Sequence, residues 1–103
     1  MSMHIERYIK FSELTFKNHP ILHPMFAGKQ AIAFFKNGYG VSIVTYLEPD
    51  PYDQTLYEIA VLKGNKDRWK INCNVDNCQE IIAYITEKEV DEIMLEVQSR
   101  ICD

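Results

Sequence analysis

The sequence has no long hydrophobic run, since nowhere do about 18 apolar residues follow one another as a membrane-spanning helix requires. Its first seven residues also lack the basic flank and apolar stretch of a secretory signal. Cysteine is scarce and odd in number, with thiols at Cys73, Cys78 and Cys102. A chain of this length does not need disulfides to fold, so we expect free thiols in a reducing compartment. These absences predict a cytoplasmic protein that is neither secreted nor inserted in a membrane.

Positive charge is also scarce. Eleven Lys and Arg residues stand against 15 Asp and Glu residues, which gives a net charge of −4. Proteins that bind a phosphate backbone instead gather lysine and arginine on one face. We therefore predict no nucleic-acid partner and no membrane partner, and an acidic surface that keeps the protein in solution.

The composition is that of one globular domain. The chain has 103 residues, of which 47% are hydrophobic and 12% aromatic. A chain of this size buries roughly 60 to 70% of its unfolded surface. We predict a single domain over residues 1–103, with an irregular N-terminal segment at 1–28, where Pro20 and Pro24 interrupt any regular pattern.

The strongest local signal is a β-hairpin around Asn37 and Gly38. Both residues tolerate the positive φ angles of a two-residue type I′ turn, and β-prone runs flank them on each side. Such a turn would set Phe34 opposite Val41. The face expected in the core then carries Ile32, Phe34, Val41 and Ile43. The other face is expected to be open and to carry the small residues Ala31, Ala33, Gly40 and Ser42.

Two more strands are predicted after the hairpin. Residues 56–62 form the third, and residues 68–73 form the fourth, where Trp69, Ile71 and Cys73 alternate with polar residues. Free cysteine is a small apolar filler, so Cys73 is expected in the core. The strands together predict an antiparallel meander of four to five strands over 29–74.

A helix is predicted at the C-terminal end. Thr86 and Glu89 have the spacing of a capping box, so the helix should begin there. Apolar residues at helical spacing follow it: Val90, Ile93, Met94, Val97 and Ile101. The pattern predicts an α+β fold with the helix over 86–102 packed on one face of the sheet, after a connector or short strand at 75–85.

No motif for catalysis, metal or cofactor is evident. His19 and His23 could join Cys73 and Cys78 in a Cys2His2 zinc site, but two His-Pro pairs in a loop are poor ligands. No glycine-rich or oxyanion-type turn accompanies any cysteine. We therefore predict no catalytic residue, no metal and no cofactor.

The segment 48–54 is the most unusual part of the predicted surface, because it combines three carboxylates, a tyrosine and two prolines. Prolines lower the ordering cost of a binding loop, and exposed tyrosines anchor partners. A solvated connector between strands is the alternative. The predicted binding residues are Tyr39 at the hairpin tip and Glu48, Asp50, Tyr52 and Asp53 in this loop.

Three sequence motifs occur in order: NGYGVSIV at 37–44, LYEIAVL at 56–62 and YITEKEV at 84–90. Through them the chain, over residues 27–100, resembles a group of small tailed-phage proteins of unassigned function. It departs from that group in a longer N-terminal segment and at 73–79. The resemblance implies a phage accessory protein in the bacterial host cytoplasm, and it carries over no catalytic residue.

The leading hypothesis is a non-catalytic phage accessory protein that binds a host or phage protein, as an inhibitor of host defence. The alternative is a small-ligand or nucleotide-binding domain, formed across a dimer on the open sheet face. A metal-dependent hydrolase or nuclease that uses the acidic loop is the weakest alternative. A homodimer stays open as well, because the sheet face opposite the helix is expected to carry Phe35, Val44 and Tyr46.

Overall fold

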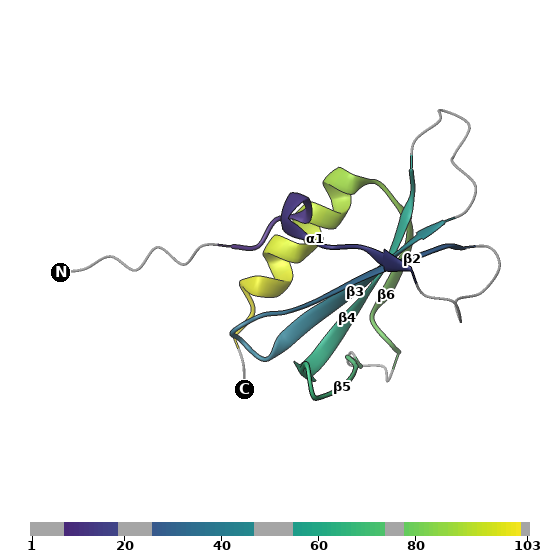
Figure 1. Ribbon diagram of the computed structural model, residues 1–103. Helices are drawn as coiled ribbons and strands as arrows, with labels where there is room; N and C mark the ends of the chain where they lie inside the picture. The colour runs from purple at the N-terminus through teal and green to yellow at the C-terminus, as the bar shows by residue number, and fades with distance from the viewer. Residues whose placement is uncertain (1–7, 19–25, 47–54, 74–77, 102–103) are drawn as a thin grey trace.

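The computed structural model describes residues 8–18, 26–46, 55–73 and 78–101. In these parts an antiparallel sheet is covered on one face by a helix (Figure 1). The elements in chain order are η1 (Phe11–Glu13, a 3-10 turn), β1 (Lys17–Asn18), β2 (Phe26–Phe34), β3 (Tyr39–Tyr46), β4 (Tyr57–Asn65), β5 (Arg68–Ile71), β6 (Ile81–Ile85) and α1 (Glu87–Gln98). The predicted α+β fold, a meander with a C-terminal helix, is confirmed.

The first five strands lie side by side in chain order, and each neighbouring pair is antiparallel. β6 returns to pair with β4 at Tyr57 to Ala60, next to the stretch of β4 that pairs with β5. Since β3 occupies one edge of β4, β5 and β6 share the other. Where they meet, Asn72 N–H donates to Val61 O (2.7 Å) and Glu80 N–H to Asn72 O (2.9 Å). Asn72 and Glu80 therefore connect the end of β5 to the start of β6 along this edge of β4.

The hairpin between β2 and β3 does not have the predicted type I′ turn. Gly38 has a φ of 87°, whereas Asn37 is not among the described residues with a positive φ. Phe35 N–H donates to Tyr39 O (2.8 Å), which closes a loop of three residues rather than two. A type I turn followed by a left-handed glycine is the usual conformation of such a loop.

The three-residue loop shifts the pairing of β2 with β3 by one residue from the predicted register. Such a shift moves the side chains of one strand to the opposite face of the sheet. Ala33 pairs with Val41 and Ala31 with Ile43, so Ala31 and Ala33 face α1. Ile32 pairs with Ser42 and is 42% exposed on the far face. The predicted core face is therefore right for Val41 and Ile43 and wrong for Ile32 and Phe34. The predicted open face is right for Gly40 and Ser42, which lie on the far face, and wrong for Ala31 and Ala33.

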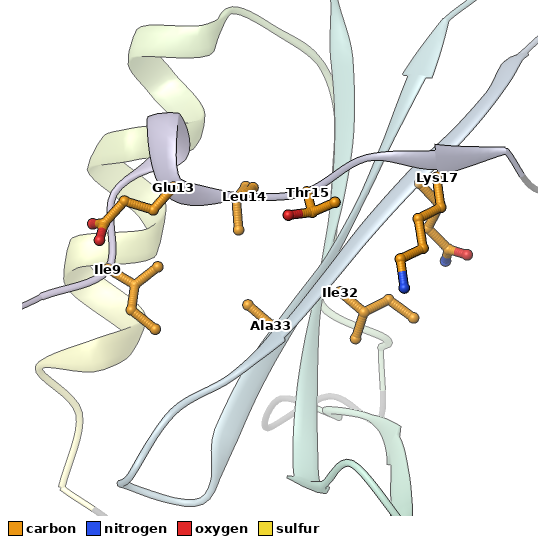
Figure 2. Close-up of a pocket in the computed structure, with 8 residues that line it drawn as sticks. Ile9, Glu13, Leu14, Thr15, Lys17, Ile32 and Ala33 are labelled. Carbon is orange, nitrogen blue, oxygen red and sulfur yellow. The ribbon is translucent and has the colours of Figure 1, made fainter.

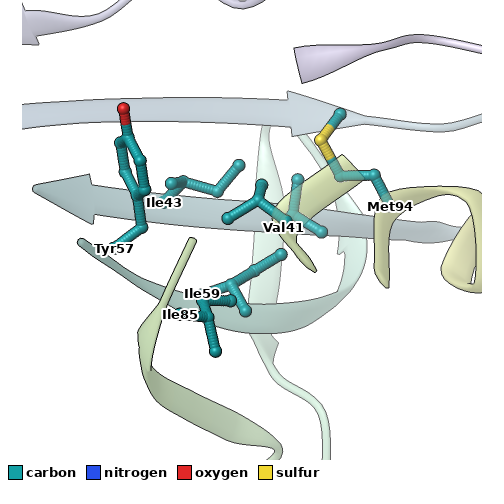
Figure 3. Close-up of a cluster of buried hydrophobic side chains, with 7 residues drawn as sticks. Val41, Ile43, Tyr57, Ile59, Ile85 and Met94 are labelled. Atoms are coloured by element: carbon teal, nitrogen blue, oxygen red, sulfur yellow. The ribbon is translucent and has the colours of Figure 1, made fainter. Parts of the chain in front are cut away.

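The hydrophobic core lies between the sheet and α1 (Figure 3). It consists of Val41, Ile43, Tyr57, Ile59, Ile85, Val90 and Met94. Three strands and the helix contribute to it. Because β3 and β4 supply the central residues, these strands form the rigid base of the fold.

The helix begins where the capping box predicts. Thr86 Oγ1 accepts from Glu89 N–H (3.3 Å), and Glu89 Oε1 accepts from Thr86 N–H (3.0 Å). α1 ends at Gln98, four residues before the predicted end, and Ile101 is 85% exposed. The apolar stripe thus ends at Val97, which is fully buried.

Residues 8–18 of the N-terminal segment, predicted to be irregular, pack on the sheet and on α1. The ring of Phe11 packs edge-on against Tyr57 with a centroid distance of 5.1 Å. Phe11 N–H donates to Asp91 Oδ1 (2.7 Å), and Gln98 exchanges two hydrogen bonds with the backbone of Ile9. β2 also begins at Phe26, before the predicted boundary at residue 28. The hydrogen bonds span 80 to 89 positions along the chain, so no local pattern could indicate them.

Candidate functional site

Tyr39 is the only predicted binding residue in the described part of the chain, and it lies at the start of β3 opposite Lys63. Lys63 Nζ is 4.8 Å from the centroid of the Tyr39 ring and 3.5 Å from its hydroxyl oxygen. The guanidinium carbon of Arg100 is 5.5 Å from the same centroid. Cations over a tyrosine ring are attracted by its π-electrons. Tyr39 therefore links β3, β4 and the end of the helix.

Arg100 is the centre of a charged network beside Tyr39. Its guanidinium makes two hydrogen bonds with the Glu80 carboxylate (2.6 and 2.8 Å) and two with Glu96 (2.6 and 2.8 Å). Asn72 Nδ2 also donates to Glu80 (3.1 Å). The hydrogen bonds from Arg100 are the main reason that the pKa of Glu80 lies below its usual value. This network attaches the chain after α1 to the segment that leads into β6.

A Glu80→Gln variant tests this network through pH. A carboxyl with a lowered folded-state pKa stabilises the fold above its unfolded-state pKa of about 4.5, and that contribution is lost as the pH falls through the folded value. We expect the variant to lose about 1 to 3 kcal/mol of unfolding free energy at pH 7. The difference from the wild type should shrink progressively below about pH 4.5. Urea unfolding of both proteins across a pH series measures this difference in unfolding free energy.

The control for this experiment is Glu92→Gln, which removes the same charge from an exposed position on α1. It should change the unfolding free energy at pH 7 by less than about 0.5 kcal/mol. A loss at Glu80 that stays constant from pH 7 to pH 3 would show that the network does not act through the charge of this carboxylate.

Asn37 connects the β2–β3 hairpin to the C-terminal end of the helix. Its Nδ2 donates to Val97 O (2.8 Å) and to Arg100 O (3.0 Å). The last carbonyls of a helix have no partner within the helix, so a side-chain donor there satisfies them. Asn37 therefore serves a tertiary contact and not only the turn.

Four cations lie close together at the end of the β4–β5 hairpin. Lys63 pairs directly with Lys70 across the two strands, on the face that also carries Tyr39. Arg68, two residues before Lys70, shares that face, and Lys66 lies in the turn. We call Lys63, Lys66, Arg68, Trp69 and Lys70 the basic hairpin. Within the described residues, no carboxylate forms an ion pair with any of its cations.

The sheet face away from α1 carries exposed apolar side chains. One row runs across four strands, because Ile32 pairs with Ser42, Ser42 with Ala60, and Ala60 with Ile81. Ile32 and Ile81 at its two ends are 42% and 40% exposed. We call Ile32, Trp69 and Ile81, with the small residues between them, the open sheet face. All three of these large apolar side chains are exposed on a face that α1 does not cover.

At the end of the sheet that carries the basic hairpin, two aromatic side chains form the border of the open sheet face. The rings of Phe34 and Trp69 are 6.4 Å apart, and Trp69 remains 43% exposed. A Cβ at Gly40 would lie 2.7 Å from the Phe34 ring, so glycine leaves room for that ring. The predicted homodimer face is partly wrong, because Phe35 packs against the helix-side core, whereas Val44 does lie on the far face.

A cleft of about 550 Å³ lies between the N-terminal segment and the outer edge of β2 (Figure 2). Its lining combines apolar and polar side chains from both sides: Ile9, Glu13, Leu14, Thr15, Lys17, Gln30, Ile32 and Ala33. It exists because β1 pairs with β2 only at Lys29 and Gln30, while the chain before β1 turns away toward α1. The alternative of a small-ligand binder stays a prediction, and this cleft is where a ligand would be sought.

The other predicted site residues lie outside the described residues. These are Glu48, Asp50, Tyr52 and Asp53 of the acidic loop, together with His19, His23 and Cys102. Cys73 is exposed, so its predicted place in the core is wrong, and it forms an isolated bridge with Gln79. In the described ranges, no three His, Cys, Asp or Glu side chains gather as they would around a metal ion.

Comparisons with known proteins do not indicate a function for this chain. No protein family model, no curated protein and no solved structure matches the chain. None of the helices in the described ranges is long and apolar enough to cross a membrane. The candidate site is therefore defined by the open sheet face and the adjoining basic hairpin, which share Trp69.

Proposed function

We propose that this protein acts by binding another protein, as a non-catalytic accessory protein in a bacterial host cytoplasm, with a host or phage protein as its partner. The observation that carries the proposal is the open sheet face. Exposed apolar side chains scattered singly are normal, but a neighbouring set on one face is typical of an interaction surface. Inhibition of a host defence protein is the first role to test.

The polar side chains on both sides of the sheet support binding more than catalysis. Glu80 and Glu96 are both held by Arg100, and Ser42 Oγ accepts from Gln30 Nε2 (2.7 Å). A catalytic acid, base or nucleophile needs a group that can reach a substrate. Trp69, by contrast, is a residue type enriched among those that contribute most to protein interfaces.

Affinity capture from bacterial lysate tests the proposal. The tagged protein should retain one specific protein, identified by mass spectrometry. An Ile32→Thr/Ile81→Thr variant should lose it, because it replaces apolar contact area with hydroxyl groups that must be desolvated on binding. Threonine keeps the preference for strand conformation, so the sheet itself should persist.

The matched control is Leu95→Thr, which changes a side chain that is 49% exposed on the helix, on the other side of the sheet. It should retain the partner as the wild type does. Thermal unfolding of each variant separates lost binding from lost folding. Equal capture by wild type and the double variant, both folded, would contradict the proposed surface.

A further inference from the structure

The basic hairpin stands out against the charge of the whole chain. The chain has a net charge of −4, yet four of its eleven Lys and Arg residues lie between positions 63 and 70, with a single Asp among them. These cations occupy one end of the sheet, next to the open sheet face. The basic hairpin is therefore a positively charged region in a chain whose net charge is negative.

The register brings like charges together without a counter-charge. Lys63 and Lys70 are direct cross-strand neighbours, and like charges in this position destabilise a sheet. Lys63 contacts the ring of Tyr39, but the side chains of Arg68 and Lys70 have no partner among the described residues. Sequences usually avoid such a pair or place a carboxylate beside it. A negatively charged ligand would relieve the repulsion that the fold leaves in place.

The cations and the exposed tryptophan flank the same strand edge. In β5, Arg68 and Lys70 point to the helix side of the sheet, and Trp69 points to the open sheet face. Among the described elements, β5 pairs only with β4, so its other edge is outermost. A segment that lies along this edge would contact the two cations on one side and the indole ring on the other.

We infer that the basic hairpin binds an acidic segment of the partner protein, with its carboxylates at Lys63, Arg68 and Lys70 and an apolar side chain against Trp69. This inference rests on the proposed function and names the chemistry of the partner. The four residues of β5 span about 13 Å, a length along which an extended peptide presents two carboxylates on each face. Charge complementarity would select the partner and speed its association.

A protein segment fits this surface better than a nucleic acid. The phosphate backbone of a nucleic acid would continue beyond the hairpin and meet the carboxylates of Glu80 and Glu96 beside Arg100. The phosphates and these carboxylates carry like charges, and like charges repel each other within about one Debye length, which is about 8 Å at physiological salt. A titration with an acidic peptide and with an oligonucleotide distinguishes the two kinds of ligand.

Trp69 is the only tryptophan of the chain, so its fluorescence reports directly on the hairpin. The purified protein is titrated with an eight-residue peptide that contains four glutamates, with the same peptide carrying glutamines, and with an eight-nucleotide oligothymidylate. We expect a saturable change in emission with the glutamate peptide alone. Its affinity should fall several-fold when salt rises from about 50 to about 200 mM.

The variant for this test is Arg68→Gln/Lys70→Gln, which removes two charges whose side chains make no hydrogen bond or ion pair within the described chain. Its affinity for the glutamate peptide should fall by about tenfold or more. Lys10→Gln/Lys88→Gln is the control, because it gives the same net charge from exposed lysines elsewhere. The control should bind as the wild type does.

Three results would overturn the inference: no response to the glutamate peptide, unchanged affinity in Arg68→Gln/Lys70→Gln, or equal or tighter binding of the oligothymidylate. The lysate capture separates this from the proposed function. If the partner is lost with the changes at Ile32 and Ile81 but kept with those at Arg68 and Lys70, protein binding stands and the acidic segment does not. If no protein is captured at all, the proposed function fails and the peptide titration still decides the chemistry of the hairpin.

Discussion

A Met94→Ala variant is expected to lose about 2 to 5 kcal/mol of unfolding free energy. Met94 is fully buried between α1 and the sheet, among Val41, Ile43 and Ile59 (Figure 3). Truncation removes its transfer free energy and leaves a cavity that a β-sheet floor cannot collapse to fill. In a domain of this size each kcal/mol lowers the melting temperature by about 4 to 8 °C, so thermal unfolding should show a drop of about 10 °C or more.

The neighbouring residue provides the control. Leu95 follows Met94 on the same helix but is 49% exposed. Both changes replace a good helix former with alanine, so the helix propensity barely differs. Leu95→Ala should cost less than about 1 kcal/mol. Similar losses in the two variants would mean that α1 does not pack on the sheet through the face that carries Met94.

Gly64→Ala is expected to cost at least about 2 kcal/mol, although it adds one methyl group. Gly64 has a φ of 130°, which side chains rarely adopt, and a Cβ there would lie 2.3 Å from the carbonyl oxygen of Arg68. Its second close contact is the Cα of Trp69, at 2.9 Å. Both atoms belong to the backbone, so the pairing of β4 with β5 would have to open. Denaturant unfolding measures the loss, and Trp69 emission should shift to longer wavelength as the ring gains water.

Lys66→Ala, in the turn of the same hairpin, is the control for Gly64→Ala. Lys66 is exposed, and its replacement should change the unfolding free energy by less than about 0.5 kcal/mol. If Gly64→Ala is as stable as this control and keeps the wild-type emission, β5 does not pair with β4 in the register described.

Local chemistry made the fold class and the start of the helix predictable. The capping box of Thr86 and Glu89 uses atoms three residues apart, so the sequence pattern alone specifies it. The hairpin position was predictable for the same reason, but its register was not. Asn37 donates to the carbonyls of Val97 and Arg100, 60 and 63 residues away, and this contact favours the three-residue loop over the two-residue turn.

The candidate site was less predictable than the fold. The sequence indicates the basic hairpin by four cations in eight positions. The net charge of the whole chain does not reveal them, because it also counts the carboxylates of the acidic helix. The open sheet face depends on the register, which places Ile32 and not Ala33 on the far side. Tyr39 was predicted as a partner anchor, yet its ring contacts Lys63 and Arg100. Binding through the acidic loop stays a prediction.

The tie between the N-terminal segment and α1 has a consequence for how the chain folds as it is synthesised. Ile9 and Phe11 hydrogen-bond to Gln98 and Asp91, so these hydrogen bonds cannot form until α1 has been made (Figure 1). A ribosome adds roughly 5 to 20 residues per second, which leaves these residues without their helix for several seconds. Until α1 has been made, the apolar side of β3 and β4 lacks the helix that covers it. The core described above therefore cannot close until α1 has been made, although the hairpins can form earlier.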